Sequence, residues 1–271
     1  MASLALAFDI LARDKGASRT FDKVGDSAER AGKKGSGFGG SILKLAGPIG
    51  LGVGALELAS AAFRKLTEFV GDSIVEAREA EKVGKTTAQI IKSTGGAAKI
   101  SADQVGALAE RISEKAGVDD EAIQTGANLL LTFKNVRNEA GKGADVFDRA
   151  TQAAVDLSAA GFGSIDGASK MLGKALNDPV KGISALGRAG VTFSEDQKKA
   201  IKKMVETGDV LGAQKVILKE VESQVGGVAE ASASMSDKVG VAWANLKERA
   251  GSALLPVLDK VGNWFLTKGL P

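Results

Sequence analysis

The chain has 271 residues and is rich in glycine (35), but it holds only 10 phenylalanines, 2 tryptophans and no tyrosine. Lys and Arg number 36 against 33 Asp and Glu, a formal net charge of +3, and no long like-charged run predicts electrostatic capture of nucleic acid. Cysteine and histidine are absent, which excludes disulfides, thiolate metal sites and the side chain best suited to acid–base catalysis near neutral pH. We therefore expect a protein that is not an enzyme, with thin helix interfaces, no metal and no cofactor.

Residues 1–40 predict a polar N-terminal segment that ends in a glycine-rich hinge. Ser3–Leu11 partly alternates, which fits a short strand or the first turns of a helix. Its apolar run lacks a preceding basic region and a following cleavage site, so we predict no signal peptide. Residues 32–40 contain five glycines and match G-x-G-x-x-G, but no convincing strand precedes them, so we interpret them as a linker.

Residues 41–95 combine the most apolar stretch of the chain with a long amphipathic helix. No charge occurs from Leu45 to Leu56, whereas Glu57 falls inside the roughly 20 residues that a membrane span would need. Two interpretations stay open: a buried Gly/Ala-rich helix or hairpin, and a segment that enters a membrane after a conformational release. The candidate membrane or partner residues are Leu45, Ile49, Leu51, Val53, Leu56 and Phe63.

Two stretches have the apolar spacing of long helices. Apolar residues recur every three or four positions from Leu56 to Ala77, and again from Val239 to Ala253 in the C-terminal segment 231–271. This spacing fits packing in a core and also fits self-association, and both interpretations stay open. Pro256 is expected to kink or end the second helix. The candidate helix-association residues are Leu66, Val70, Ile74, Val239, Trp243 and Leu246.

Residues 96–230 predict a compact run of short helices joined by loops of a few residues, as in a helical bundle. Helix-start signals recur along this region at Ser101, Asp119, Asp145 and Ser164. We interpret the acidic run at 119–121 as capping and dipole complementarity rather than as a cation site. A Gly/Ala/Ser-rich linker is expected from Gly226 to Ser234. The predicted fold class is all-α.

Three helix starts are packed into Asn177–Gly226. The pair Asp178-Pro179 places a good cap before a proline at the first helical position, and Ser194 with Gln197 has the spacing of a capping box. The pair Gly208-Asp209 is suited to end one helix on a left-handed glycine and to cap the next. The stretch therefore predicts three short amphipathic helices on tight turns.

The order of these residues resembles the core domain of tape measure proteins of long-tailed phages. The resemblance covers about residues 104–227 and continues more weakly through Trp243–Glu248 and Ala253–Leu258. The residues of the core-domain motif are Asp178, Pro179, Gly190, Phe193, Ser194, Gln197, Gly208 and Asp209.

The resemblance implies a virion protein in the lumen of the phage tail, made in the bacterial cytoplasm, that sets tail length during assembly and leaves the tube during DNA ejection. It also implies a few parallel copies and contacts with tail tube, tail-tip and tail-assembly chaperone proteins. Members of the family are usually much longer, so we expect this chain to be the N-terminal part of a longer protein. The alternative is a membrane-active helical protein, pore-forming or envelope-crossing, built around residues 42–63.

Overall fold

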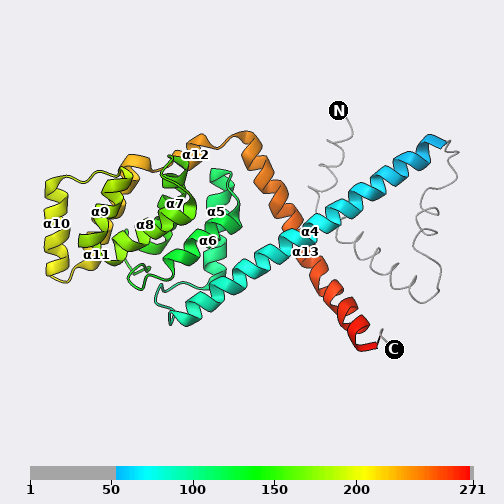
Figure 1. Ribbon diagram of the computed structural model, residues 1–271, viewed down its shortest axis with the longest axis horizontal. Helices are drawn as coiled ribbons and strands as arrows, with labels where there is room; N and C mark the ends of the chain where they lie inside the picture. Colours follow the sequence, from blue (N-terminus) through cyan, green and yellow to red (C-terminus); the bar gives the residue numbers. More distant parts are fainter. Residues whose placement is uncertain (1–52, 269–271) are drawn as a thin grey trace. The chain divides into compact units, whose positions relative to one another are not determined.

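The computed structural model describes residues 53–268, with side chains described for residues 64–260, and this part of the chain is helical without a strand (Figure 1). In chain order the helices are α4 (Val53–Ser93), α5 (Ala102–Ala116), α6 (Asp120–Leu130), α7 (Val146–Ala159), α8 (Ile165–Asn177), α9 (Pro179–Ala189), α10 (Glu195–Glu206), α11 (Val210–Val225), α12 (Val228–Ser232) and α13 (Met235–Lys268). The predicted all-α fold class is confirmed. The chain divides into two compact units, Met1–Phe63 and Arg64–Pro271, and the contacts described below lie within the second.

Several predicted helix starts are confirmed by hydrogen bonds from side chains to the backbone. The Ser101 hydroxyl accepts the Gln104 N–H at 3.2 Å, and the Gln104 side chain accepts the Ser101 N–H at 2.9 Å, which completes the capping box of α5. The Asp119 carboxylate and the Ser164 hydroxyl accept N–H groups in the first turns of α6 and α8. Local sequence therefore sets where these helices begin.

The start of α7 corrects one prediction. Asp145 stands at the N-cap position, but its side chain makes no capping hydrogen bond. The cap comes from Asn138 instead, whose side-chain oxygen accepts the N–H of Phe147 at 3.0 Å and whose amide donates to Asp148 at 2.7 Å. An antiparallel bridge between Asn138 and Asp145 holds the loop in the position that this cap requires.

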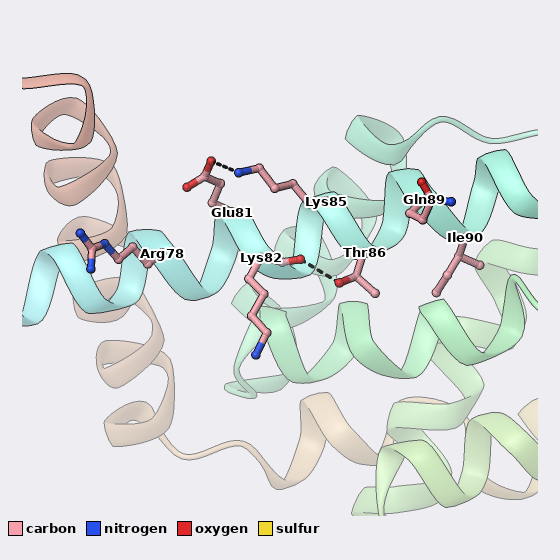
Figure 2. A pocket seen from close by; sticks show the side chains of 7 residues that line it. All are labelled: Arg78, Glu81, Lys82, Lys85, Thr86, Gln89 and Ile90. Carbon is pink, nitrogen blue, oxygen red and sulfur yellow. Dashed lines mark hydrogen bonds and ion pairs between the residues drawn. The ribbon is translucent and has the colours of Figure 1, made fainter. Parts of the chain in front are cut away.

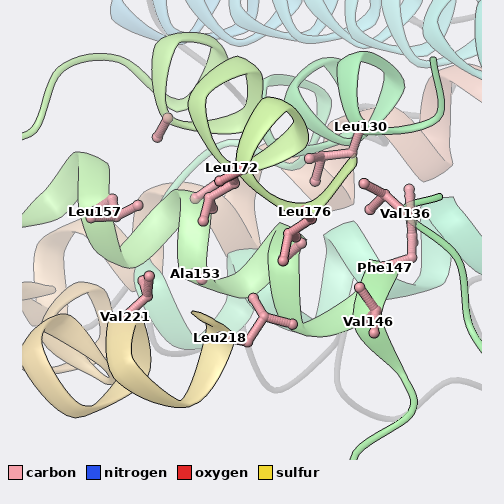
Figure 3. Close-up of a cluster of buried hydrophobic side chains, with 14 of the residues drawn as sticks. Leu130, Val136, Val146, Phe147, Ala153, Leu157, Leu172, Leu176, Leu218 and Val221 are labelled. Carbon is pink, nitrogen blue, oxygen red and sulfur yellow. The ribbon is translucent and has the colours of Figure 1, made fainter. Parts of the chain in front are cut away.

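The core lies in the α5–α12 module, defined here as residues 102–232. One cluster of buried apolar side chains is shared by helices of this module, and Figure 3 shows part of it converging from α6, α7, α8 and α11. The residues labelled there are Leu130, Val136, Val146, Phe147, Ala153, Leu157, Leu172, Leu176, Leu218 and Val221. Phe147 is fully buried and Phe193 also belongs to the cluster, and most of the remaining members are aliphatic side chains and alanine. Small and aliphatic side chains thus make up most of the contacts between these helices.

Residues 226–234 are not the plain linker that composition predicts, because Val228–Ser232 forms the short helix α12. Ala229 is 1% exposed and packs in the core cluster. The carboxylate of Asp156 on α7, itself 2% exposed, accepts the N–H of Ala229 at 3.0 Å. This hydrogen bond between the buried Asp156 carboxylate and a backbone N–H holds α12 against α7. The sequence alone does not predict that the two residues are partners.

The structure also corrects the expected end of the last helix, since α13 continues through Pro256 to Lys268. A proline at this position removes the N–H that would bond to the Ser252 carbonyl. Both residues are exposed, so water can satisfy that carbonyl. Of the two predictions for Pro256, a kink or an end of the helix, the end is therefore wrong.

Candidate interaction surface on the two long helices

Helices α4 and α13 cross in direct backbone contact. A Cβ atom at Gly251 of α13 would overlap the carbonyl oxygen of Ser73 and would lie 2.8 Å from the Cβ of Ala77, both on α4. Ser73 and Ala77 are 0% and 1% exposed. The crossing is therefore built from small residues on both helices, which let the two backbones approach closely.

Larger side chains flank this crossing. The rings of Phe69 and Trp243 have their centroids 5.6 Å apart at an interplanar angle of 53°, a tilted aromatic pair. The ammonium group of Lys247 lies 3.3 Å from the carboxylate of Glu76 and 3.7 Å from that of Asp72. Because the Lys247 side chain is only 17% exposed, this ion pair is screened less than a surface pair.

The six predicted helix-association residues divide into two groups. Val70 and Ile74 are half-buried on α4, next to the crossing at Ser73. The other four remain exposed. Their exposed fractions are 58% for Leu66, 60% for Val239, 48% for Trp243 and 37% for Leu246. Val70, Ile74 and the side of Trp243 that packs on Phe69 are thus used within the chain, whereas Leu66, Val239, Leu246 and the rest of the Trp243 ring face solvent.

Exposed apolar side chains are concentrated on these two helices. Among the side chains that the structure describes, the large exposed hydrophobic ones lie on α4 and α13, with Val180 as the exception. They are Leu66, Val75, Met235, Val239, Trp243, Leu246, Val257 and Leu258. Val239, Trp243 and Leu246 follow one another at spacings of four and three on one side of α13. We call these three residues the α13 apolar row, and such a row is typical of a helix that another helix covers.

The core-domain motif has a structural role in the helix starts of α9 and α10. Asp178 accepts the N–H of Lys181 at 3.4 Å, and Pro179 is buried at the first position of α9. Ser194 and Gln197 form a complete capping box at the start of α10. These predicted cap roles are confirmed.

The rest of the motif forms the turns between α9, α10 and α11. Gly190 and Gly208 adopt left-handed backbones with φ of 113° and 83°, where a side chain would be strained. Asp209 accepts the N–H of Gly212 at 2.8 Å and caps α11. Phe193 is 8% exposed and belongs to the core cluster. The motif residues therefore serve as caps, turns and core positions of this part of the fold.

Two residues of the acidic run at 119–121 lie next to a third carboxylate, Glu248, which the sequence does not predict. Oxygen atoms of Asp120 and Glu121 on α6 and of Glu248 on α13 all lie within 4.8 Å of one another. We call these three residues the carboxylate cluster. Burial, together with the charge of Asp120, raises the pKa of Glu121 to about 8. The cluster is close enough to share a cation, but no further feature of the described residues points to a ligand, so we assign none.

One hollow in the described surface lies along a single helix. The hollow in Figure 2 is lined by Arg78, Glu81, Lys82, Lys85, Thr86, Gln89 and Ile90, which all belong to α4. Its polar groups are partly engaged within the helix, since Lys85 pairs with Glu81 and the Thr86 hydroxyl donates to the Lys82 carbonyl. A hollow lined by one helix cannot enclose a ligand from both sides.

The predicted membrane or partner segment falls largely outside the described residues. This holds for Leu45, Ile49 and Leu51, while Val53 and Phe63 lie in α4 at positions whose side chains are not described, as does Leu56. In the part of the chain that the structure describes, none of the helices has both the length and the hydropathy required to cross a membrane.

Comparison of the chain with protein-family models, with curated proteins and with solved structures finds no match. A functional assignment therefore depends on the residues themselves and on the surface that they form.

Proposed function

We propose that the chain is a structural phage virion protein, the N-terminal part of a tail tape measure protein, and that it is not an enzyme. In this role it sets tail length during assembly and is released from the tail tube during DNA ejection. The proposal is supported by the ordered residue blocks that resemble the family. It is also supported by the place of the motif residues, which cap and turn α9, α10 and α11 in one compact module.

The observation that carries the proposal is the concentration of exposed apolar side chains on α4 and α13. A catalytic domain needs a concave site with convergent polar groups, whereas an assembly protein needs apolar surface that its partners cover. The 34 residues of α13 extend over roughly 50 Å at a rise of about 1.5 Å per residue. An extended helix with an exposed apolar row suits a protein that lies along a tube.

The partners follow from the same surface. The α13 apolar row has the spacing of a coiled-coil seam, so we propose that copies of the chain associate through α13 inside the tail. Tail tube, tail-tip and tail-assembly chaperone proteins are the further proposed partners, with the α5–α12 module as the compact unit that they recognise. No contact in the described part of the chain favours the membrane-active alternative, so we propose the structural role only.

A pair of charge substitutions tests the proposal. The variant Val239→Asp/Trp243→Asp, introduced into the genome that encodes the chain, places two carboxylates on the apolar row and should greatly reduce the number of complete tails seen by electron microscopy. The control Lys199→Asp/Lys202→Asp alters two exposed positions on α10 and should leave tails normal. Normal tails from the α13 variant would contradict the proposal. Loss of tails in both variants would show that added charge alone is harmful and would also count against it.

A further inference from the structure

The N-terminal half of α13 packs on the end of the module that α5 and α6 form. Val241 is 8% exposed, and a Cβ atom added at Gly117, directly after α5, would lie 2.7 Å from the Cβ of Asp237. Arg249 reaches back to α5 and donates to Glu110 at 2.6 Å. The segment before this contact contains Gly227, whose φ is 79°, and it provides a place where the chain can change direction.

This interface carries an excess of negative charge. The carboxylate cluster brings Asp120 and Glu121 from α6 against Glu248 from α13. The acidic groups next to it are Asp119 at the N-cap of α6, Glu110 of α5 and Glu76 of α4. The basic groups beside it are Arg249, which pairs with Glu110, and Lys247, which pairs with Glu76 and Asp72. Both cations are paired with carboxylates outside the cluster, and the charge of Arg249 offsets only part of the negative charge around Glu248.

Like charges held this closely are costly unless some of the groups are neutral. Protonation of a carboxyl removes the repulsion and supplies a donor that a neighbouring carboxylate can accept. We propose that the docking of α13 on α5 and α6 is a pH-sensitive contact, held when the carboxylate cluster shares protons and weakened when all its members are ionised.

The direction of the pKa shifts agrees with this geometry. Burial raises the pKa of Asp120 and of Glu248, and in Glu248 the charges of Asp120 and Glu110 raise it further. The pKa of Glu121 rises from 4.5 to about 8. Undocking removes Glu248 and the cover that α13 provides, so the pKa of Glu121 falls, although the neighbouring charges of Asp120 and Asp119 remain. The docked state therefore binds more protons.

The sign of the pH dependence follows. Docking is strongest at low pH, where the groups are protonated in both states, and it weakens as the pH rises toward about 8, where the docked Glu121 loses its proton. Each unit by which docking raises the pKa of one group corresponds to about a tenfold change in the docking constant across that range. The inference is independent of the proposed phage function, because it concerns a contact within one chain.

Because the sequence contains no cysteine, cysteines introduced into the full chain can be spin-labelled without labelling at any other position. Spin labels at Arg111→Cys on α5 and Ala242→Cys on α13, both exposed positions, report the distance between the two helices. Double electron–electron resonance at a series of pH values from 5 to 9, with EDTA present, should show one short-distance population at low pH and a growing long-distance population at high pH. Circular dichroism at each pH should show that the helices persist.

Isosteric neutral variants locate the effect. Glu121→Gln/Glu248→Gln removes two of the titrating groups and should keep the short distance at every pH, whereas Glu206→Gln, exposed on α10, should behave like the unchanged chain. An unchanged distance distribution across the pH range would overturn the inference. So would a pH response that persists in the double variant, or one that coincides with a loss of helical content.

Discussion

The carboxylate of Asp156 on α7 accepts a hydrogen bond at 3.0 Å from the backbone N–H of Ala229, 73 residues later in the chain. This bond places α12 against α7 and makes an apparent linker part of the module. Asp156→Ala would leave the Ala229 N–H buried without an acceptor, which costs about 1–3 kcal/mol of unfolding free energy.

Chemical denaturation of the full chain measures this cost. Hydrogen exchange should show the largest loss of protection in residues 228–232. Glu230→Ala removes a carboxylate that is exposed on the same short helix and should change stability by less than about 0.5 kcal/mol. Equal stability of the two variants would show that the Asp156 bond does not hold α12.

The contact between α8 and α9 leaves no room for a side chain at one position. A Cβ atom at Gly182 would overlap the backbone of Ala175, whereas a Cβ atom at Gly187 on the same helix would meet nothing within 4 Å. Gly182→Ala should therefore destabilise the module by about 1–3 kcal/mol through overpacking. Gly187→Ala should be neutral or should stabilise it by about 0.5–1 kcal/mol, because alanine favours a helix. Urea denaturation of both variants measures the difference in stability between them. Similar midpoints would contradict the packing described.

A matched pair of glycines on α13 tests the crossing with α4. Gly251 lies against Ser73, while Gly240 has open space around its Cβ position. Gly251→Ala should separate the helices and raise hydrogen exchange in residues 66–78, with the α5–α12 module unaffected. Gly240→Ala should not raise it. Unchanged protection of residues 66–78 in Gly251→Ala would argue that the two helices do not depend on this contact.

The start of α7 offers a test of the cap that the structure reassigned. Asn138→Ala removes the acceptor for the Phe147 N–H and should cost about 1 kcal/mol, as the loss of a helix cap does. Asp145→Ala should cost less, because the Asp145 side chain makes no capping bond. Thermal denaturation of the two variants gives the order, and a larger loss at Asp145 would restore the assignment that the sequence predicts.

Sequence patterns predicted what is local in this fold. The capping boxes at Ser101 and Ser194 and the glycine turn at Gly208 depend on residues within four positions of one another, and all were read correctly. The cap from Asn138 and the Asp156 bond connect residues brought together by tertiary packing, so periodicity could not find them. For the start of α7 the sequence pattern favoured Asp145 as the cap, and for residues 226–234 the composition predicted a linker without a partner.

The candidate surface was predicted in part for the same reason. Apolar spacing identified Leu66 and Trp243 as members of helix faces but could not say that α4 and α13 pack on each other at Gly251. The carboxylate cluster was missed because Glu248 lies more than a hundred residues from Glu121 in the chain. An acidic run at a helix start is typical of a cap, and no sequence pattern predicts that Glu248 lies next to it.

The most direct test of the proposed function is mass spectrometry of purified phage particles before and after DNA ejection is triggered. Peptides from residues 96–230 should be present in intact particles and depleted from the emptied tails, as expected for a protein that fills the tube and leaves it. Absence of these peptides from intact particles, or their full retention in emptied tails, would contradict the assignment.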